Sequence, residues 1–123
     1  MSTKHRLLVI EDDPDILEIL NIIFQEEGFE VISNGTGLSV QEILAFEPAL
    51  IVLDVRIRGF EKTGAQLCGE LKAHHQTSHL PILLMSAERD LPTLARQSGA
   101  SAFVPKPFDI DLLLLKVNEL IKR

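Results

Sequence analysis

Four short apolar runs in this 123-residue chain each lead into a polar residue with reactive chemistry. The runs cover residues 7–10, 50–53, 82–85 and 102–104, and they precede Glu11 with Asp12, Asp54, Ser86, and Lys106 with Pro107. Parallel strands end at a common edge of their sheet, and open α/β sheets bind ligands at that edge. If the runs are parallel strands, three carboxylates, a hydroxyl and an amine meet in one pocket.

The segments between these runs have the spacing of amphipathic helices. In the first, apolar residues recur at i, i+3, i+4, i+7 and i+8 from Ile16 to Phe24. That helix should begin at Asp13-Pro14, a capping residue before a proline at the first helical position, and end at Gly28. The sequence predicts strands near 6–10, 29–33, 49–53, 80–85 and 101–104, and further helices near 37–46, 62–74, 88–98 and 109–122. We expect Gly99 to end the fourth helix and Asp109 or Asp111 to cap the fifth.

The two central strands predict the fold class. Residues 49–53 and 80–85 are continuous apolar runs rather than alternating ones, as in strands that helices bury on both faces. A parallel sheet with right-handed helical crossovers is a three-layer, doubly wound α/β domain. We expect one such domain over residues 1–123, because this length is typical of a single domain.

Composition excludes several classes of function. The formal charge is −6 without a run of Lys or Arg, which argues against direct binding to nucleic acid or to an anionic membrane. We find no secretory or membrane segment. The lone Cys68 cannot pair within the chain, so we expect a small buried residue and a reducing, cytoplasmic location. His74, His75 and His79 lie in a polar stretch without Cys or acidic partners, so we interpret them as solvated rather than metal-binding.

The acidic stretch after the first strand is a candidate metal site. Asp13 should cap the following helix, which leaves Glu11 and Asp12 to point into the pocket. Carboxylates held close together raise each other's pKa unless a cation neutralises them. Mg²⁺ is the expected cation, because it prefers oxygen ligands.

Asp54 is the candidate nucleophile, since it ends a central apolar strand where a carboxylate has no evident structural purpose. Carboxylates attack phosphorus to give acyl phosphates, and a metal withdraws charge from the phosphoryl oxygens. Ser86 could donate a hydrogen bond to one such oxygen, and Lys106 could donate to another. A cis peptide at Lys106-Pro107 would fit a fixed turn there.

Taken together, these features resemble the receiver domain of two-component response regulators over the whole chain. The resemblance is carried by five motifs in order: residues 11–15, the strand ending at Asp54, residues 84–87, Gly99-Ala100 and residues 106–108. It implies a flavodoxin-like sheet of order 2-1-3-4-5. It also implies roles for the polar residues. Asp54 would be the phosphoacceptor, Glu11 and Asp12 the Mg²⁺-binding pair, the Arg56 carbonyl a further ligand, Ser86 and Phe103 the switch, and Lys106 the phosphate partner.

Three positions depart from the usual receiver pattern. The segment 55–64 has no proline and is about two residues longer than usual, so access to the acceptor depends on how this loop folds. Arg56 and Glu88 occupy positions that govern phosphoryl lifetime in receivers, and we expect them to pair across the pocket mouth and hinder water. Phe103 replaces the usual Tyr and cannot donate a hydrogen bond.

The last helix is too apolar for one buried face. Four consecutive leucines span more than one helical turn, so they cannot all face the sheet. We expect Leu112 and Leu115 to be exposed while the remaining apolar residues pack inward, namely Leu113, Leu114, Val117, Leu120 and Ile121. The exposed pair is either two scattered surface residues or a surface for docking or homodimerisation.

The resemblance implies a signalling switch rather than an enzyme with a turnover substrate. A histidine kinase or phosphotransfer protein would supply the phosphoryl group, and a downstream output protein or domain would read the result. The chain would be either a complete regulator or the first part of a longer one. A degenerate receiver that works as an interaction module without phosphorylation is the main alternative.

Two other classes fit the sequence less well. A haloacid-dehalogenase-like phosphatase needs a second Asp where Arg56 stands. A flavodoxin needs a phosphate loop after the first strand, where Glu11, Asp12 and Asp13 would repel the phosphate.

Overall fold

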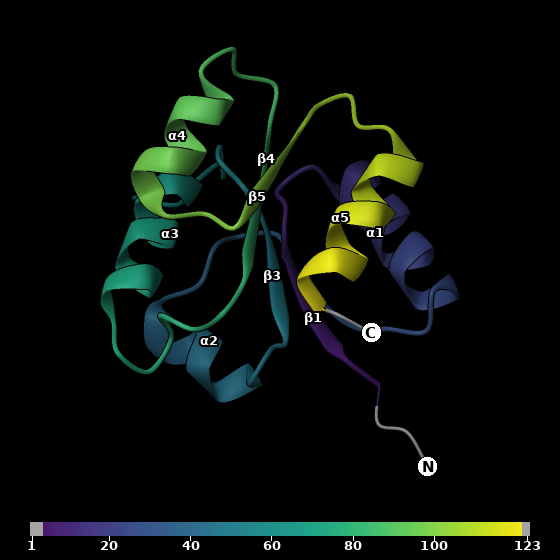
Figure 1. Cartoon of the computed structure of the whole chain (residues 1–123), viewed down its shortest axis with the longest axis horizontal. Coiled ribbons are helices and arrows are strands. Elements are labelled where there is room, and N and C mark those ends of the chain that lie inside the picture. Colours follow the sequence, from purple (N-terminus) through teal and green to yellow (C-terminus); the bar gives the residue numbers. More distant parts are fainter. Residues whose placement is uncertain (1–3, 122–123) are drawn as a thin grey trace.

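A computed structural model describes residues 4–121 as a doubly wound α/β domain (Figure 1). The elements alternate strictly between strand and helix. The strands are β1 (Arg6–Ile10), β2 (Glu30–Asn34), β3 (Leu50–Asp54), β4 (Ile82–Ser86) and β5 (Ala102–Pro105). The helices are α1 (Pro14–Glu26), α2 (Val40–Phe46), α3 (Gly64–Ala73), α4 (Leu91–Ser98) and α5 (Ile110–Ile121).

The sheet is parallel throughout and has the predicted order β2-β1-β3-β4-β5. Figure 1 shows α1 and α5 against one face, with α2, α3 and α4 against the other. Each face has its own apolar core, one built around Phe24 and Val117 and the other around Ile43 and Leu67. Every residue of β3 and β4 is buried, as the continuous apolar runs predicted.

Three helices begin two or three residues later than the sequence predicted, and α5 begins one residue later. The second was expected from residue 37 but starts at Val40, because Ser39 forms a capping box with Glu42. The third starts at Gly64 after a similar box between Thr63 and Gln66, and the fourth at Leu91. Capping boxes thus mark the starts of α2 and α3, whereas the Asp90 side chain makes no capping hydrogen bond at the start of α4.

Strands β2 to β5 begin and end one or two residues later than predicted. The later ends bring the residue after the apolar run into the strand. Asp54 pairs with Met85, and Ser86 pairs with Pro105, so both functional candidates belong to the sheet itself. The backbone makes the ladder regardless of side-chain polarity. The strand backbone therefore fixes the direction in which both side chains point.

The helix ends agree with the capping residues chosen from the sequence. The Asp13 carboxylate accepts from the N–H groups of Asp15 and Ile16 at the start of α1. Gly99, with a φ of 79°, ends α4. At α5, Asp109 rather than Asp111 is the cap, since its Oδ1 accepts from the Leu112 N–H at 3.2 Å. The peptide between Lys106 and Pro107 is cis.

Helix α5 presents its leucines as predicted. Leu113 and Val117 are fully buried, whereas Leu112 is 39% exposed and Leu115 is 56% exposed. The other expected inward residues are half-buried, namely Leu114, Leu120 and Ile121. Between residues 4 and 121, no helix is long and apolar enough to cross a membrane.

Candidate functional site

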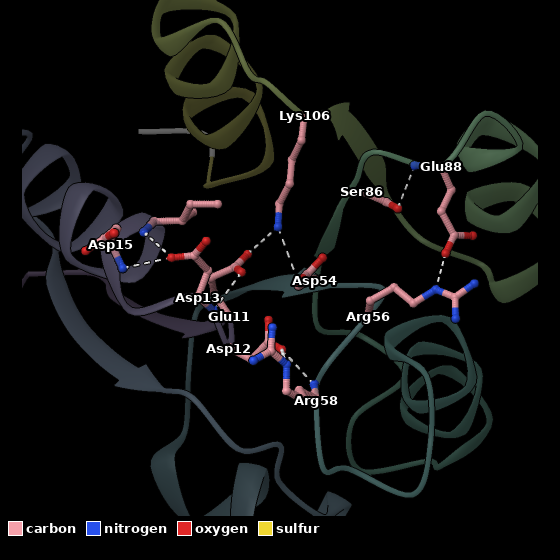
Figure 2. A network of polar contacts seen from close by, with 11 residues as sticks. Glu11, Asp12, Asp13, Asp15, Asp54, Arg56, Arg58, Ser86, Glu88 and Lys106 are labelled. Atoms are coloured by element: carbon pink, nitrogen blue, oxygen red, sulfur yellow. Dashed lines mark hydrogen bonds and ion pairs between the residues drawn. The ribbon is translucent and has the colours of Figure 1, made fainter.

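The carboxyl ends of β1, β3, β4 and β5 surround a cavity of about 420 Å³. Figure 2 shows the predicted polar side chains converging on it. Its walls include every predicted metal and phosphoryl-contact residue, namely Glu11, Asp12, Asp54, Arg56, Ser86, Glu88 and Lys106. The sheet topology therefore brings together residues that lie up to 95 positions apart in the sequence.

Three carboxylates form the acidic side of this cavity. Glu11 is 1% exposed and Asp54 is 4% exposed, while Asp12 is half-buried. One oxygen from each lies within 4.8 Å of the others. A cluster of carboxylate oxygens with this spacing matches the ligands that Mg²⁺ prefers. Among the described residues this is the one such group, and the residues present fit a divalent cation.

Lys106 supplies a positive charge within this acidic cluster. Its Nζ donates to Glu11 Oε2 at 2.7 Å and lies 3.3 Å from Asp54 Oδ2. Burial lowers the pKa of Lys106, but the Glu11 and Asp54 carboxylates outweigh it and raise that pKa above its ordinary value. One ammonium is thus shared between two buried carboxylates, which leaves the cluster with excess negative charge.

The same imbalance shifts the pKa of Asp54. Burial, followed by repulsion from Glu11, raises the pKa of Asp54 to about 6, against the opposing effects of Lys106 and the Arg56 N–H. A nearby cation would favour the ionised form that acts as a nucleophile. The geometry therefore suits a carboxylate that becomes fully charged when a metal occupies the cluster.

Asp12 is oriented by a contact that sequence analysis did not anticipate. Its Oδ2 accepts from the Arg58 N–H at 2.8 Å, across 46 positions of sequence. The donor comes from the unusual 55–64 loop, which packs Ile57 into the core and places the Phe60 ring against Gly37. No sequence motif indicates a backbone donor, because every residue except proline has one.

The 55–64 loop forms one wall of the cavity and leaves it open. Arg56, Ile57 and Arg58 line the cavity, and the loop returns to the sheet through Gly64. The Gly64 N–H donates to the Val55 carbonyl at 2.7 Å. A Cβ at Gly64 would lie only 2.0 Å from the Asp54 carbonyl oxygen, so this close approach needs glycine.

The predicted pairing of Arg56 with Glu88 is present at the cavity mouth (Figure 2). The Arg56 Nε donates to Glu88 Oε1, and this contact raises the pKa of the guanidinium. The Glu88 backbone N–H donates in turn to Ser86 Oγ at 3.0 Å. A hydroxyl can accept and donate together, so Ser86 keeps its O–H for a group in the cavity.

Among the residues predicted to bind the metal, contact the phosphoryl group or act as the switch, Phe103 alone does not line the cavity. Its ring is half-buried on β5 and packs against the core beneath α3 and α4. Lys116, which the sequence did not single out, donates to the Phe103 carbonyl and places its ammonium over the ring. Helical periodicity puts Lys116 on an outer face of α5 and gives no hint of these contacts.

Cys68 and the three histidines lie away from this cavity. Cys68 is buried, and burial raises the pKa of its thiol. His75 and His79 are exposed, and the half-buried His74 stacks its ring on His75. None of the three belongs to a metal-ligand group among residues 4–121.

Comparison with known proteins identifies relatives of this chain. Residues 7–118 match the response regulator receiver domain family. The DNA-binding response regulator MtrA of Mycolicibacterium smegmatis is 32% identical over 125 residues, which cover 99% of this chain and 53% of MtrA. The chain thus spans about half the length of the curated relatives it matches.

Solved structures of response regulators are also similar to this chain. A crystal structure described as that of a response regulator from Chloroflexus aurantiacus has a TM-score of 0.84 at 28% identity, with 98% of this chain and 100% of that one covered. The receiver domain of NtrX from Brucella abortus has a TM-score of 0.80 at 28% identity, with 94% and 98% covered.

Proposed function

The chain belongs to the response regulator receiver domain family, and we propose that it accepts a phosphoryl group on Asp54 from a histidine kinase or phosphotransfer protein. One observation carries this proposal. The Asp54 carboxylate is nearly buried, yet it borders an open cavity, with an ammonium at 3.3 Å and two further carboxylates beside it. Burying a charge at a cavity wall costs stability, and the chemistry of a phosphoacceptor accounts for that cost.

Each of these residues has a role in the proposed phosphoryl transfer. An Asp54 oxygen bonds to phosphorus while the bond from phosphorus to the donor's imidazole nitrogen breaks, and its electron pair stays on the imidazole. Lys106 and the Ser86 hydroxyl then donate to phosphoryl oxygens. Later attack by water on phosphorus releases inorganic phosphate and restores the carboxylate. The domain therefore promotes reactions of its own Asp54 and has no separate turnover substrate.

Glu11, Asp12, Asp54 and the Arg56 carbonyl would hold Mg²⁺. When bound, the ion withdraws charge from the phosphoryl oxygens and offsets the excess negative charge of the cluster. The Arg58 N–H would keep Asp12 directed into the site.

The phosphorylation test is incubation with acetyl phosphate and Mg²⁺, followed by intact mass measurement. We expect a single phosphoryl adduct that requires Mg²⁺ and is absent in Asp54→Asn. If Mg²⁺ binds but no adduct forms, the domain is a degenerate receiver that works as an interaction module without phosphorylation.

The Arg56–Glu88 ion pair would lengthen the lifetime of the phosphoryl group. It lies across the mouth of the cavity, where attacking water must enter. We expect Arg56→Ala to dephosphorylate faster than wild type, while Arg89→Ala, which removes an exposed cation from the same loop as Glu88, keeps the wild-type rate. Equal hydrolysis rates in Arg56→Ala and wild type would contradict this role.

Phosphorylation would act on partners through Ser86, Phe103 and the exposed pair Leu112 and Leu115. The added charge would draw Ser86 and Lys106 inward, Phe103 would follow, and the α5 surface would bind a downstream output protein or domain, or a second copy of the chain. A monomeric solution mass in both phosphorylation states would exclude the homodimer and leave the output protein as the partner.

A further inference from the structure

We propose that Lys116 is a positioning residue for Phe103, and that it holds the aromatic ring at the free edge of the sheet. This inference rests on the proposed function, in which Phe103 moves when Asp54 is phosphorylated. Lys116 contacts the same residue twice. Its Nζ donates to the Phe103 carbonyl at 2.5 Å and lies 4.9 Å from the centre of the Phe103 ring.

The free edge of the sheet explains the first contact. β5 is the last strand in the sheet order, and β4 is its only strand neighbour within the described chain (Figure 1). Carbonyl groups on the outer side of an edge strand have no partner in the ladder. Lys116 reaches from α5 and supplies a donor for one of them. This contact depends on the backbone of Phe103 and is kept wherever its side chain points.

The second contact depends on where the ring lies. The ring is half-buried, packs on one side against the core, and does not line the cavity beside Asp54. A cation over an aromatic face is attracted by the ring's quadrupole. If the ring turned inward toward Ser86, it would lose the ammonium. Lys116 therefore favours the ring position seen here over the inward one.

The same lysine joins the ring to the proposed docking surface. Leu112 lies four residues before Lys116 on α5, a spacing that places both side chains on one face of the helix. Leu115 is its chain neighbour and is the most exposed leucine of α5. Inward movement of the ring would thus leave an uncovered cation beside the two leucines, and a partner could detect that change.

The test follows the Phe103 ring directly. 4-Fluorophenylalanine is placed at position 103, and the ¹⁹F spectrum is recorded without phosphoryl donor. Lys116→Gln keeps a donor for the carbonyl but removes the cation, and Lys116→Met removes both. We expect either change to increase the inward population about two- to fivefold, the size expected from losing a partly exposed cation–π contact. Lys116→Arg should keep the wild-type spectrum.

Lys72 offers a matched control on the other side of the sheet. It also donates to a strand-flanking carbonyl, that of Leu80 at 2.6 Å, but no aromatic contact of its ammonium is found among residues 4–121. Lys72→Met should leave the Phe103 resonance unchanged. A wild-type spectrum in Lys116→Gln would overturn the proposal, as would an equal shift in Lys72→Met.

The proposed phosphorylation of Asp54 and the proposed role of Lys116 are tested by independent measurements. Intact mass after acetyl phosphate treatment reports whether Asp54 is phosphorylated, while the fluorine spectrum is read in untreated protein. In protein that forms the adduct, Lys116→Gln should also phosphorylate about two- to fivefold faster, because fewer molecules hold the ring outward.

Discussion

The parallel strands have two ends, which form the carboxyl edge and the amino edge of the sheet. These two edges differ in their buried polar groups. Three of the four buried polar residues in the described chain lie at the carboxyl edge, namely Glu11, Asp54 and Ser86. The fourth, Thr77, lies before β4 at the amino edge, where its hydroxyl donates to the Leu71 carbonyl at 2.6 Å. That edge also has a hollow of about 330 Å³, with Glu47 and His79 exposed on its wall.

The difference between the edges is one of charge rather than of hydrogen bonding. Within residues 4–121, no buried side-chain polar atom lacks a hydrogen-bond partner. At the amino edge, the buried group is a neutral hydroxyl that donates to the backbone carbonyls of Leu71 and His74. At the carboxyl edge, two buried carboxylates share one ammonium. The repulsion between the carboxylates favours binding of a cation or of a proton. The buried group at the amino edge therefore contributes to stability, whereas those at the carboxyl edge form a reactive charged cluster.

The largest expected effect comes from a steric clash introduced at the carboxyl edge. Gly64→Ala should lower the free energy of unfolding by about 3 kcal/mol, because its Cβ would meet the Asp54 carbonyl oxygen at 2.0 Å. Gly69→Ala in the same helix has open space and should raise it by about 0.5–1 kcal/mol. Urea unfolding followed by far-UV circular dichroism measures both changes. A loss below 1 kcal/mol in Gly64→Ala would mean that the loop yields easily.

The next effect tests the charge imbalance through pH. The pKa of Asp54 is about 6 in the folded protein and about 3.8 in the unfolded chain, so the folded state holds the proton more tightly. Stability from this group is present below about pH 4 and is lost as pH rises through about 6. Without Mg²⁺ near pH 8, Asp54→Asn should thus be more stable than wild type by about 2–3 kcal/mol.

Two conditions sharpen the pH prediction. The advantage of Asp54→Asn should vanish near pH 4, where both side chains are neutral, and millimolar Mg²⁺ should stabilise wild type more than the variant. The measurement is urea unfolding at each pH. A difference that does not change with pH would mean that Asp54 ionises normally.

A smaller effect is expected at the amino edge, with no dependence on pH. Thr77→Val keeps the shape of the side chain but leaves the buried Leu71 carbonyl without its donor. We expect a loss of about 1–2 kcal/mol. The same value should be found near pH 4 and near pH 8, because no charge is involved. A loss that grew with pH would contradict the division between a neutral edge and a charged one.

The smallest effect concerns the histidines of the amino edge. His75→Ala removes an exposed ring that stacks on His74 at 5.1 Å between centroids. We expect a change within about 0.5 kcal/mol, as at most surface positions. Zn²⁺ should not raise the unfolding temperature of wild type above that of the variant. A Zn²⁺-dependent difference would reveal a metal site that the sequence and the structure do not indicate.

Much of the site followed from the sequence, because each of its polar residues ends a run with a strong local signal. Asp54 and Ser86 end apolar strands, and Glu11 and Asp12 precede a well-marked helix cap. The common edge of a parallel sheet then requires these residues to meet. The Arg56–Glu88 pair was also predictable, since opposite charges stand at equivalent positions after neighbouring strands. Its place across the mouth follows from the sheet order.

What the sequence determined by itself was therefore the alternation of elements, the burial of β3 and β4, and the residues at the carboxyl edge. Each depends on local patterns of apolar residues and caps. Tertiary structure decided the contacts that carry no local pattern, namely the Arg58 N–H on Asp12, the close approach at Gly64, and Lys116 over Phe103. These depend on how backbone groups and edges meet after folding, and any residue with an N–H or a long cationic side chain could have supplied the donor.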